Sequence, residues 1–391
     1  MKSKNLVPNW RFPEFKNDEW VEKPMNKLLT IGSGRDYKHL TKGNIPVYGT
    51  GGYMLSVNDY LYDGESACIG RKGTINKPVF LTGKFWTVDT LFYTHSFKGC
   101  LPKFIYYSFL NINWNNYNEA SGVPSLSKTT IGKIDIPIPL EKEEQEQIVS
   151  FLNSIDNLIS TQKQKLVTLK EHKKALMQTL FPKGDETVPI WRFPEFINDG
   201  EWREKSLGEI CDYWNGGSHE NSLSKDGQYH LISLNSIDIE GNLKEDMKRI
   251  DYLDNSLQKN DLVMVLSDVA HGNLLGLSAI IPNDKFVLNQ RMAGLRKKKN
   301  EKIINEFLRL TINTNQKYFK QHGQGSSQLN LSKASVTDFP VLVPKREEEQ
   351  QKIANCINSV DNIITIQTKK VEALNQHKKA LMQNLFTSGE I

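Results

Sequence analysis

The stretch EEQEQIVSFLNSIDNLISTQKQKLVTLKEHKKALMQTLF, from Glu143 to Phe181, returns later in the chain as EEQQKIANCINSVDNIITIQTKKVEALNQHKKALMQNLF, from Glu348 to Phe386. About half of the aligned positions are identical, and both copies end in HKKALMQ, one variable residue and LF. An internal repeat of this kind means that the chain uses one structural plan twice.

Apolar residues recur in both copies at alternating steps of four and three. This 3.5-residue repeat, with no Pro or Gly inside it, predicts two coiled-coil helices, each on the order of 50 Å long. The polar exceptions on this seam match between the copies, Gln162 with Gln367 and Lys173 with Lys378. An antiparallel pair would bring the two glutamines together, and polar seam residues can fix register. The predicted seam residues are Ile148, Leu152, Ile155, Ile159, Gln162, Leu166 and Leu169, then Ile353, Ile357, Val360, Ile364, Gln367, Val371 and Leu374.

The alternative is two separate amphipathic helices, each packed on its own domain. Matching length, matching seam and matching polar positions favour helices that pack on each other.

Composition indicates a soluble protein with room for two or three domains, since 391 residues are 38% hydrophobic and 24% charged. We find no signal peptide and no apolar run long enough to span a membrane, so we expect a cytoplasmic location. The four cysteines lack zinc-binding spacing, which predicts reduced thiols and no metal site. The net charge of +5 is uneven: residues 1–140 are basic, whereas 184–344 carry a slight acidic excess. This charge allows a phosphate-bearing partner without requiring one.

A second repeated phrase, WRFPEF, opens each globular segment at Trp10 and again at Trp191. Its aromatic side chains either anchor each segment by packing, which we favour, or form a nucleic-acid stacking platform. Short apolar runs between glycine turns predict strands, and Lys103–Asn113 and Ile303–Thr311 have helical spacing. Two polar loops, 121–128 and 324–333, precede the strand-like exits into the long helices. The frame therefore repeats, while the residues inside the two globular segments differ.

These signals predict an α+β fold with an internal pseudo-two-fold repeat: two mixed α/β domains separated by two long helices that form an antiparallel coiled coil. The predicted boundaries are 1–142 for the first domain, 143–182 for the first long helix, 183–346 for the second domain and 347–388 for the second long helix.

Catalytic motifs are missing from the sequence. No glycine-rich loop is followed by Lys-Ser or Lys-Thr, and neither HExxH nor Asn-Pro-Pro-aromatic occurs. Glu171-His172-Lys173 lies on a heptad helix without an acidic companion, so we reject it as a nuclease site. His172 and His377 repeat at equivalent positions, which favours packing or partner contact over metal ligation. We predict no catalytic residues.

Taken together, these features resemble the specificity (S) subunit of type I restriction–modification systems over essentially the whole chain. The carrying phrases are the paired WRFPEF, the two Leu-Ser-Lys exits, the EEQ helix starts, the paired HKKALMQ, the run Ile69 to Gly73, and the run from Asp261 to Arg291. The resemblance implies two target recognition domains, each reading half of a bipartite, asymmetric DNA sequence. It also implies that the long helices bind two modification (methyltransferase) subunits, and that restriction (translocase–nuclease) subunits join them.

No active site or cofactor is implied for this chain itself. S-adenosylmethionine, ATP and Mg would belong to the partner subunits.

Candidate DNA contacts lie on the polar loops. Arg and Lys suit guanine, and Asn and Gln suit adenine. The alternative for each candidate is a solvated loop residue or a phosphate contact, which positions the protein without specifying sequence. The candidates are Arg71, Lys72, Ser125, Ser127 and Lys128 in the first domain, and His271, Asn273, Gln290, Arg291, Gln328, Asn330 and Lys333 in the second.

Helix length would act as a ruler under this hypothesis, because ~50 Å corresponds to about fifteen base pairs. Half-sites should then lie about one to one and a half turns apart, and deleting a heptad from each helix should change the gap or abolish binding. The acidic excess of 184–344 predicts weak, salt-sensitive DNA binding by this chain alone.

Rival hypotheses are a coiled-coil scaffold, a regulatory DNA-binding protein and an enzyme of unknown type.

Overall fold

The computed structural model describes residues 7–16, 20–269 and 273–386. The chain forms two compact units, unit 1 from residues 1–165 and 367–391 and unit 2 from residues 166–366. Two helices of 39 residues, α4 (Lys142–Leu180) and α9 (Glu347–Leu385), contribute to both units. Each unit therefore combines one globular segment with a part of both long helices, whereas the four predicted segments treat the helices separately.

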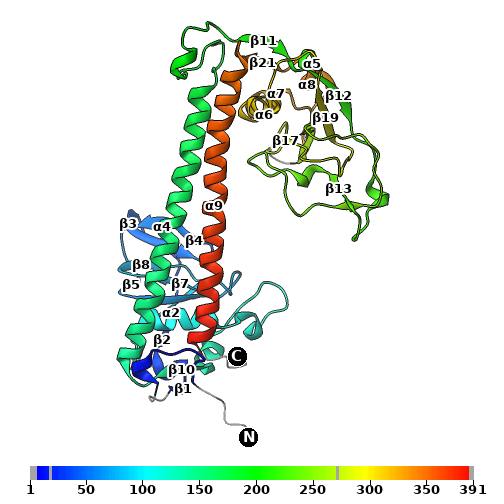
Figure 1. The fold of residues 1–391 in the computed structure, drawn as a ribbon. Coiled ribbons are helices and arrows are strands. Elements are labelled where there is room, and N and C mark those ends of the chain that lie inside the picture. Colours follow the sequence, from blue (N-terminus) through cyan, green and yellow to red (C-terminus); the bar gives the residue numbers. More distant parts are fainter. Residues whose placement is uncertain (1–6, 17–19, 270–272, 387–391) are drawn as a thin grey trace. The chain divides into compact units, whose positions relative to one another are not determined.

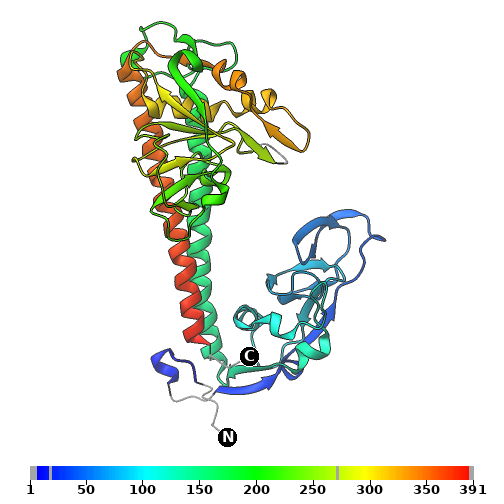
Figure 2. The same ribbon diagram turned by 90° about the vertical axis from the view of Figure 1, so that its right-hand side faces the viewer.

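The long helices lie side by side (Figures 1 and 2) and run antiparallel. In unit 1, Lys378 pairs with Asp156 at 2.5 Å, and Gln367 Nε2 donates to the backbone and side-chain oxygens of Gln162 at 2.9 and 3.0 Å. In unit 2, Lys173 pairs with Asp361 at 2.6 Å. Residue numbers thus rise along α4 as they fall along α9. Every predicted seam residue is buried or half-buried, and 39 residues correspond to ~58 Å, slightly longer than expected.

Unit 1 is built on two four-stranded sheets with strand orders β2-β9-β6-β7 and β4-β3-β8-β5, and on an antiparallel ribbon of β1 and β10. Its strands are β1 (Trp20–Pro24), β2 (Thr30–Ser33), β3 (Lys42–Gly49), β4 (Gly52–Val57), β5 (Tyr62–Asp63), β6 (Ser66–Gly70), β7 (Val79–Leu81), β8 (Lys84–Thr87), β9 (Leu91–His95) and β10 (Asp135–Pro139). Its shorter α-helices are α1 (Met25–Leu28), α2 (Pro102–Asn111) and α3 (Lys128–Lys133).

Unit 2 contains a four-stranded sheet of order β12-β19-β15-β17, a three-stranded sheet of order β14-β13-β18, and the ribbons β11-β21 and β16-β20. Its strands are β11 (Arg203–Ser206), β12 (Cys211–Asn215), β13 (Tyr229–Ile232), β14 (Arg249–Ile250), β15 (Leu262–Val265), β16 (Ser267–Val269), β17 (Ser278–Ile280), β18 (Phe286–Leu288), β19 (Met292–Lys297), β20 (Gln328–Asn330) and β21 (Pro340–Val343). Its shorter α-helices are α5 (Leu207–Ile210), α6 (Asn305–Thr314), α7 (Gln316–His322) and α8 (Lys333–Thr337).

Sheet topology repeats between the units, although the residues of the strands differ. The order β2-β9-β6-β7 corresponds to β12-β19-β15-β17, with antiparallel neighbours throughout. The parallel pair of β3 and β8 corresponds to β13 and β18. The prediction that the second segment repeats the plan of the first with different residues is therefore confirmed, and the repeat extends to the order of the strands. Backbone pairing needs only suitable patterns of burial, and different apolar residues satisfy it equally well.

Local sequence explains the central elements. Strands β6 and β15 are buried at every position, as their short apolar runs predict. Ser127 and Ser332 begin α3 and α8 as N-caps, accepting hydrogen bonds from the backbone N–H groups of Thr130 and Ser335. The predicted polar loop 324–333 differs from the structure, because residues 328–330 form β20 against β16.

The repeated phrases WRFPEF and EEQ bind each other in each unit. Arg11 donates to both carboxylate oxygens of Glu144 at 2.7 and 2.6 Å, and Arg192 contacts Glu349 in the same way at 2.7 Å. Both glutamates are fully buried. The pKa of Arg192 is raised, chiefly by its hydrogen bonds to Glu349. These buried ion pairs, here called the clasps, join each lead-in to the start of a long helix.

The glutamine of EEQ performs the same task in both units. Gln145 accepts a hydrogen bond from the Leu101 N–H at 2.9 Å and donates to the Gly99 carbonyl at 3.1 Å. In unit 2, Gln350 accepts from the Ile304 N–H at 2.9 Å and donates to a carbonyl, that of Lys302, at 3.1 Å. These bonds satisfy backbone groups at the start of α2 and α6, and so fix where each helix begins.

Candidate nucleic-acid interface

All five candidates of the first domain line one hollow of about 760 Å³ in unit 1. Arg71 and Lys72 come from the segment after β6, and the other three come from the loop that leads into α3. An isolated antiparallel bridge joins Lys72 to Ser125, and the Leu126 N–H donates to the Arg71 carbonyl at 2.8 Å. Backbone hydrogen bonds therefore hold together two loops that lie far apart in sequence.

The charge of this hollow is mainly positive. Arg71, Lys72 and Lys128 are exposed, and Lys128 Nζ lies 6.0 Å from the centre of the Phe92 ring. Glu119 is the one acidic residue among the described residues that line the hollow, and it accepts hydrogen bonds from the hydroxyls of Thr130 and Ser127. These bonds lower the pKa of the Glu119 carboxyl. Three exposed cations beside hydrogen-bonded hydroxyls suit a phosphate or a base edge.

In unit 2, Gln290 and Arg291 share a hollow of about 330 Å³ at the turn between β18 and β19. Both side chains are exposed. Arg291 has a φ of 68°, a left-handed conformation that is uncommon outside glycine. The β18–β19 turn thus presents an amide and a guanidinium side by side.

The other candidates of unit 2 are more dispersed. Gln328 and Asn330 lie on β20, where Ser267 Oγ donates to Asn330 Oδ1 at 2.7 Å and accepts from Gln328 Nε2. Lys333 begins α8, and its Nζ lies 5.8 Å from the centre of the Tyr213 ring. Asn273 instead accepts a hydrogen bond from Lys320 at 3.2 Å. His271 lies outside the described residues.

Sequence reasoning missed the charged residues around the β18–β19 turn. Asn289 is buried and donates to Glu220 Oε1 at 2.8 Å, while Lys248 donates to Glu220 Oε2 at 3.1 Å. The hydrogen bond from Lys248, and after it the one from Asn289, lower the pKa of the Glu220 carboxyl. The three residues come from distant segments, so no sequence spacing reveals the cluster. A polar Asn directly after the apolar run of β18 is the only available signal.

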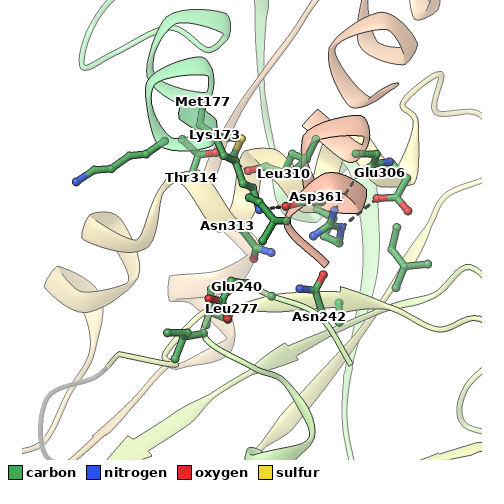
Figure 3. Close-up of a pocket in the computed structure, with 18 of the residues that line it drawn as sticks. Lys173, Met177, Glu240, Asn242, Leu277, Glu306, Leu310, Asn313, Thr314 and Asp361 are labelled. Atoms are coloured by element: carbon green, nitrogen blue, oxygen red, sulfur yellow. Dashed lines mark hydrogen bonds and ion pairs between the residues drawn. The ribbon is translucent and has the colours of Figure 1, made fainter. Parts of the chain in front are cut away.

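A separate cavity of about 1000 Å³ in unit 2 lies between α6, the loop 239–243 and the adjoining turns of α4 and α9. Figure 3 shows Lys173 and Asp361 pairing at its wall, with Leu310 and Asn313 facing it from α6. Lys170 pairs with Glu240 at 3.0 Å. Among the candidates that the structure describes, Asn273 is the only one that lines this cavity.

Among the described residues, no group of three or more His, Cys, Asp or Glu side chains is arranged to hold a metal ion. No helix in that part of the chain is long and apolar enough to cross a membrane.

One α+β topology is used twice, and polar and basic loop side chains in each copy suit nucleic-acid recognition by two units. The family model for the type I restriction modification DNA specificity domain matches residues 17–171 and again residues 199–376. The chain therefore belongs to this family, which confirms the resemblance read from the sequence. Specificity subunits recognise DNA and are not themselves catalytic, so the chain is not an enzyme.

Individual relatives agree with this assignment. The chain is 26% identical over 360 residues to the type I restriction enzyme MjaVIII specificity subunit of Methanocaldococcus jannaschii, covering 86% of this chain and 80% of the relative. The crystal structure of a type I restriction–modification S subunit from M. genitalium matches with a TM-score of 0.65 at 14% identity, covering 98% and 100% of the two chains.

A structure from a study of complex assembly in the type I R-M system matches with a TM-score of 0.58 at 13% identity, over 97% and 99% of the two chains. At these identities the structural matches bear on the fold alone. They confirm the α+β class with two mixed domains and long antiparallel helices.

Proposed function

We propose that this chain reads a bipartite, asymmetric DNA sequence as the specificity subunit of a type I restriction–modification complex, with one unit for each half-site. The observation that carries the proposal is the doubled topology with different loop side chains. Both units present the lysine of the Leu-Ser-Lys loop, Lys128 or Lys333, but unit 1 adds Arg71 and Lys72, whereas unit 2 adds Gln290 and Arg291. Equal scaffolds with unequal side chains suit a target whose two halves differ.

Two modification subunits are the proposed partners of the long helices, and restriction subunits are proposed to join that core. The helices support this because they offer the same surface twice. Leu158 on α4 and Ile363 on α9 are 44% and 47% exposed, and they occupy the same position of the repeat. A repeated surface suits two identical partners. S-adenosylmethionine, ATP and Mg are proposed for those partners, and no cofactor is proposed for this chain.

The length of the helix pair is proposed to set the gap between half-sites. Removing one heptad from both α4 and α9 shortens each helix by ~10 Å, equivalent to about three base pairs. The gap in the methylated sequence should then shrink, or binding should be lost. An unchanged gap would refute the ruler.

Mapping of methylated adenines across a genome tests the function directly. Cells that hold the modification subunits should methylate one bipartite sequence when this chain is present and lose that methylation when it is deleted. A matched strain carrying the chain without the modification subunits should show no methylation. Methylation that persists without the chain would contradict the proposal and favour the scaffold hypothesis.

A further inference from the structure

One short turn has the same backbone hydrogen bonds in both units, although its residues differ between them. Corner 1 is Val88-Asp89-Thr90, between β8 and β9 of unit 1. Corner 2 is Asn289-Gln290-Arg291, between β18 and β19 of unit 2. Because β8 corresponds to β18 and β9 to β19 in the repeated topology, the corners are equivalent. They have no residue in common.

Equivalent backbone hydrogen bonds hold both corners. The first residue donates to the neighbouring parallel-strand segment, Val88 to the Tyr48 carbonyl at 2.9 Å and Asn289 to the Ile232 carbonyl at 3.0 Å. The first residue also accepts from the residue after the corner, at 2.9 Å in corner 1 and 3.3 Å in corner 2. The turn therefore has the same connections in both units.

A glycine packs against each corner in the same place. A Cβ atom on Gly34 would lie 1.9 Å from the Val88 carbonyl oxygen, and a Cβ on Gly216 would lie 2.1 Å from the Asn289 carbonyl oxygen. Only glycine allows so close an approach of two backbones. Both units thus require a glycine at the residue that faces the corner.

The side chains that the corners display are different. The first residue points inward in both, since Val88 and Asn289 are buried. The next two residues are exposed or half-exposed, and they present a carboxylate and a hydroxyl in unit 1 but an amide and a guanidinium in unit 2. Each corner lines a hollow, of about 540 Å³ in unit 1 and about 330 Å³ in unit 2.

Both corners are joined to the loops that carry predicted DNA contacts. In unit 1, Arg71 donates its N–H to the Thr90 carbonyl at 2.7 Å, and the Arg71 carbonyl accepts from Leu126 at 2.8 Å. In unit 2, Leu266 donates to the Arg291 carbonyl at 3.0 Å, and the Leu266 carbonyl accepts from Leu331 at 2.8 Å. Corner, central strand end and Leu-Ser-Lys loop thus form one continuous hydrogen-bonded strip in each unit.

We propose that corners 1 and 2 determine sequence specificity, with Asp89 and Thr90 contacting bases of one half-site and Gln290 and Arg291 contacting bases of the other. The proposal rests on the proposed function and extends it to Asp89 and Thr90. Arg291 suits guanine and Gln290 suits adenine, whereas a carboxylate such as Asp89 accepts from the amino group of cytosine. A carboxylate repels phosphates, so at a DNA surface Asp89 suits a base edge rather than the backbone.

The test uses the full chain assembled with its modification subunits and a library of randomised DNA duplexes, from which methylated sequences are read. Asp89→Asn keeps the size of the side chain but adds an amide donor, which favours adenine over cytosine. Arg291→Asn removes the guanidinium, and Asn tolerates the left-handed backbone of that position. Asp63→Asn on β5 and Arg203→Asn on β11 are matched controls, being exposed and of the same residue types.

Asp89→Asn is expected to change base preference roughly ten- to hundredfold at one position of one half-site, and Arg291→Asn is expected to do so in the other half-site only. The controls should leave the methylated sequence unchanged. An unchanged sequence in both corner variants overturns the proposal, and so does a uniform loss of binding across all sequences, which is the behaviour of a phosphate contact.

Failure of the proposed function gives a different result, because the unaltered complex would then methylate no preferred sequence. Melting temperature and assembly with the modification subunits report whether each variant is folded. Should a corner variant prove unfolded, Thr90→Ser and Gln290→Glu are smaller changes at the same corners and decide the question by the same outcomes.

Discussion

Helix α2 of unit 1 and helix α6 of unit 2 are equivalent elements that differ at a buried position facing the long helices. Each has ten residues, and each follows a segment held by a buried glutamine, Gln145 or Gln350. Phe104 packs on Phe386 with ring centres 5.4 Å apart, and Phe307 packs on Phe181 at 5.5 Å. Counting from the helix start, Tyr107 of α2 then corresponds to Leu310 of α6.

The difference between Tyr107 and Leu310 changes what surrounds the ion pairs between the long helices. In unit 1, the Tyr107 hydroxyl donates to Asp156 at 2.8 Å, and the same aspartate pairs with Lys378. In unit 2, the equivalent Asp361 pairs with Lys173 and borders the 1000 Å³ cavity of Figure 3. The clasps and the hydrogen bonds of the buried glutamines are therefore the same in both units. The residues that pack between each globular segment and the long helices differ.

The largest expected effect tests the constant part, the clasps. Arg11→Ala and Arg192→Ala each leave a fully buried glutamate without its arginine, which should destabilise the corresponding unit by about 3–5 kcal/mol. Hydrogen exchange of peptides from each unit measures this separately. The exposed pair of Lys142 and Glu146 is the control, and Lys142→Ala should cost less than about 0.5 kcal/mol. Equal exchange in both Arg variants and the unaltered chain would show that the clasps are not anchors.

A smaller effect tests the variable part, at Tyr107 and Leu310. Tyr107→Phe removes a hydrogen bond to a carboxylate and should cost unit 1 about 1.5–3 kcal/mol. Leu310→Tyr places a hydroxyl beside Asp361 and fills part of the cavity, so unit 2 should lose less than unit 1 does, or gain stability. Urea unfolding followed by exchange in each unit measures both. A larger loss for Leu310→Tyr would mean that the two sites are not equivalent.

Tyr107 also predicts a pH dependence that its phenylalanine variant lacks. Burial first, and then the hydrogen bond to Asp156, raise the pKa of Tyr107 above its ordinary value near 10. The folded state therefore holds this proton more tightly than the unfolded state does. Its contribution is complete below pH ~10 and is lost as the pH rises beyond that value. Unfolding at pH 9 and pH 11 should diverge more for the unaltered chain than for Tyr107→Phe.

Trp20, the first residue of β1, and Trp202, directly before β11, give a third and smaller contrast. Trp20 Nε1 donates to Glu144 at 3.1 Å, whereas Trp202 Nε1 is buried without a hydrogen-bond partner among the described residues. Trp20→Phe and Trp202→Phe lose similar apolar area, so their difference isolates the hydrogen bond. Trp20→Phe should cost about 1–2 kcal/mol more. Equal losses, measured by thermal unfolding with exchange in each unit, would assign the whole effect to packing.

Sequence alone predicted the long helices well, because a heptad pattern is a local signal that repeats many times. It named the five candidates of unit 1 from two polar segments, but it did not predict that these segments meet in one hollow, which depends on the long-range bridge between Lys72 and Ser125. The buried role of EEQ escaped it. Two adjacent glutamates such as Glu143 and Glu144 normally indicate a solvated helix start. Only the ion pair with the distant Arg11 explains why Glu144 is buried.

Gln290 and Arg291 were candidates from the sequence, but the equivalence of the two corners could not be predicted, because it rests on strand order and not on residue type. Val88, Asp89 and Thr90 differ from Asn289, Gln290 and Arg291 at every position, and the corners share only their hydrogen bonds, a buried first residue and a facing glycine. Long-range pairing of this kind leaves no periodic trace in a single sequence. The same reason explains why Glu220 and Lys248 were missed around Asn289.

The smallest expected effect concerns the ion pairs between the long helices themselves. Lys378→Met and Lys173→Met each place an apolar side chain on the seam and leave one partly exposed aspartate without its lysine. Seam packing offsets much of the lost attraction, so each should cost about 1 kcal/mol or less. Asp156 keeps the Tyr107 hydroxyl after the change, whereas Asp361 has no tyrosine at the equivalent position. Lys173→Met should therefore destabilise unit 2 slightly more than Lys378→Met destabilises unit 1. Raising the salt concentration should reduce the difference in destabilisation between the two variants, because screening weakens a bare charge pair more than a hydrogen-bonded one. A larger loss for Lys378→Met would show that Tyr107 stabilises the unit through the lysine and not through the aspartate.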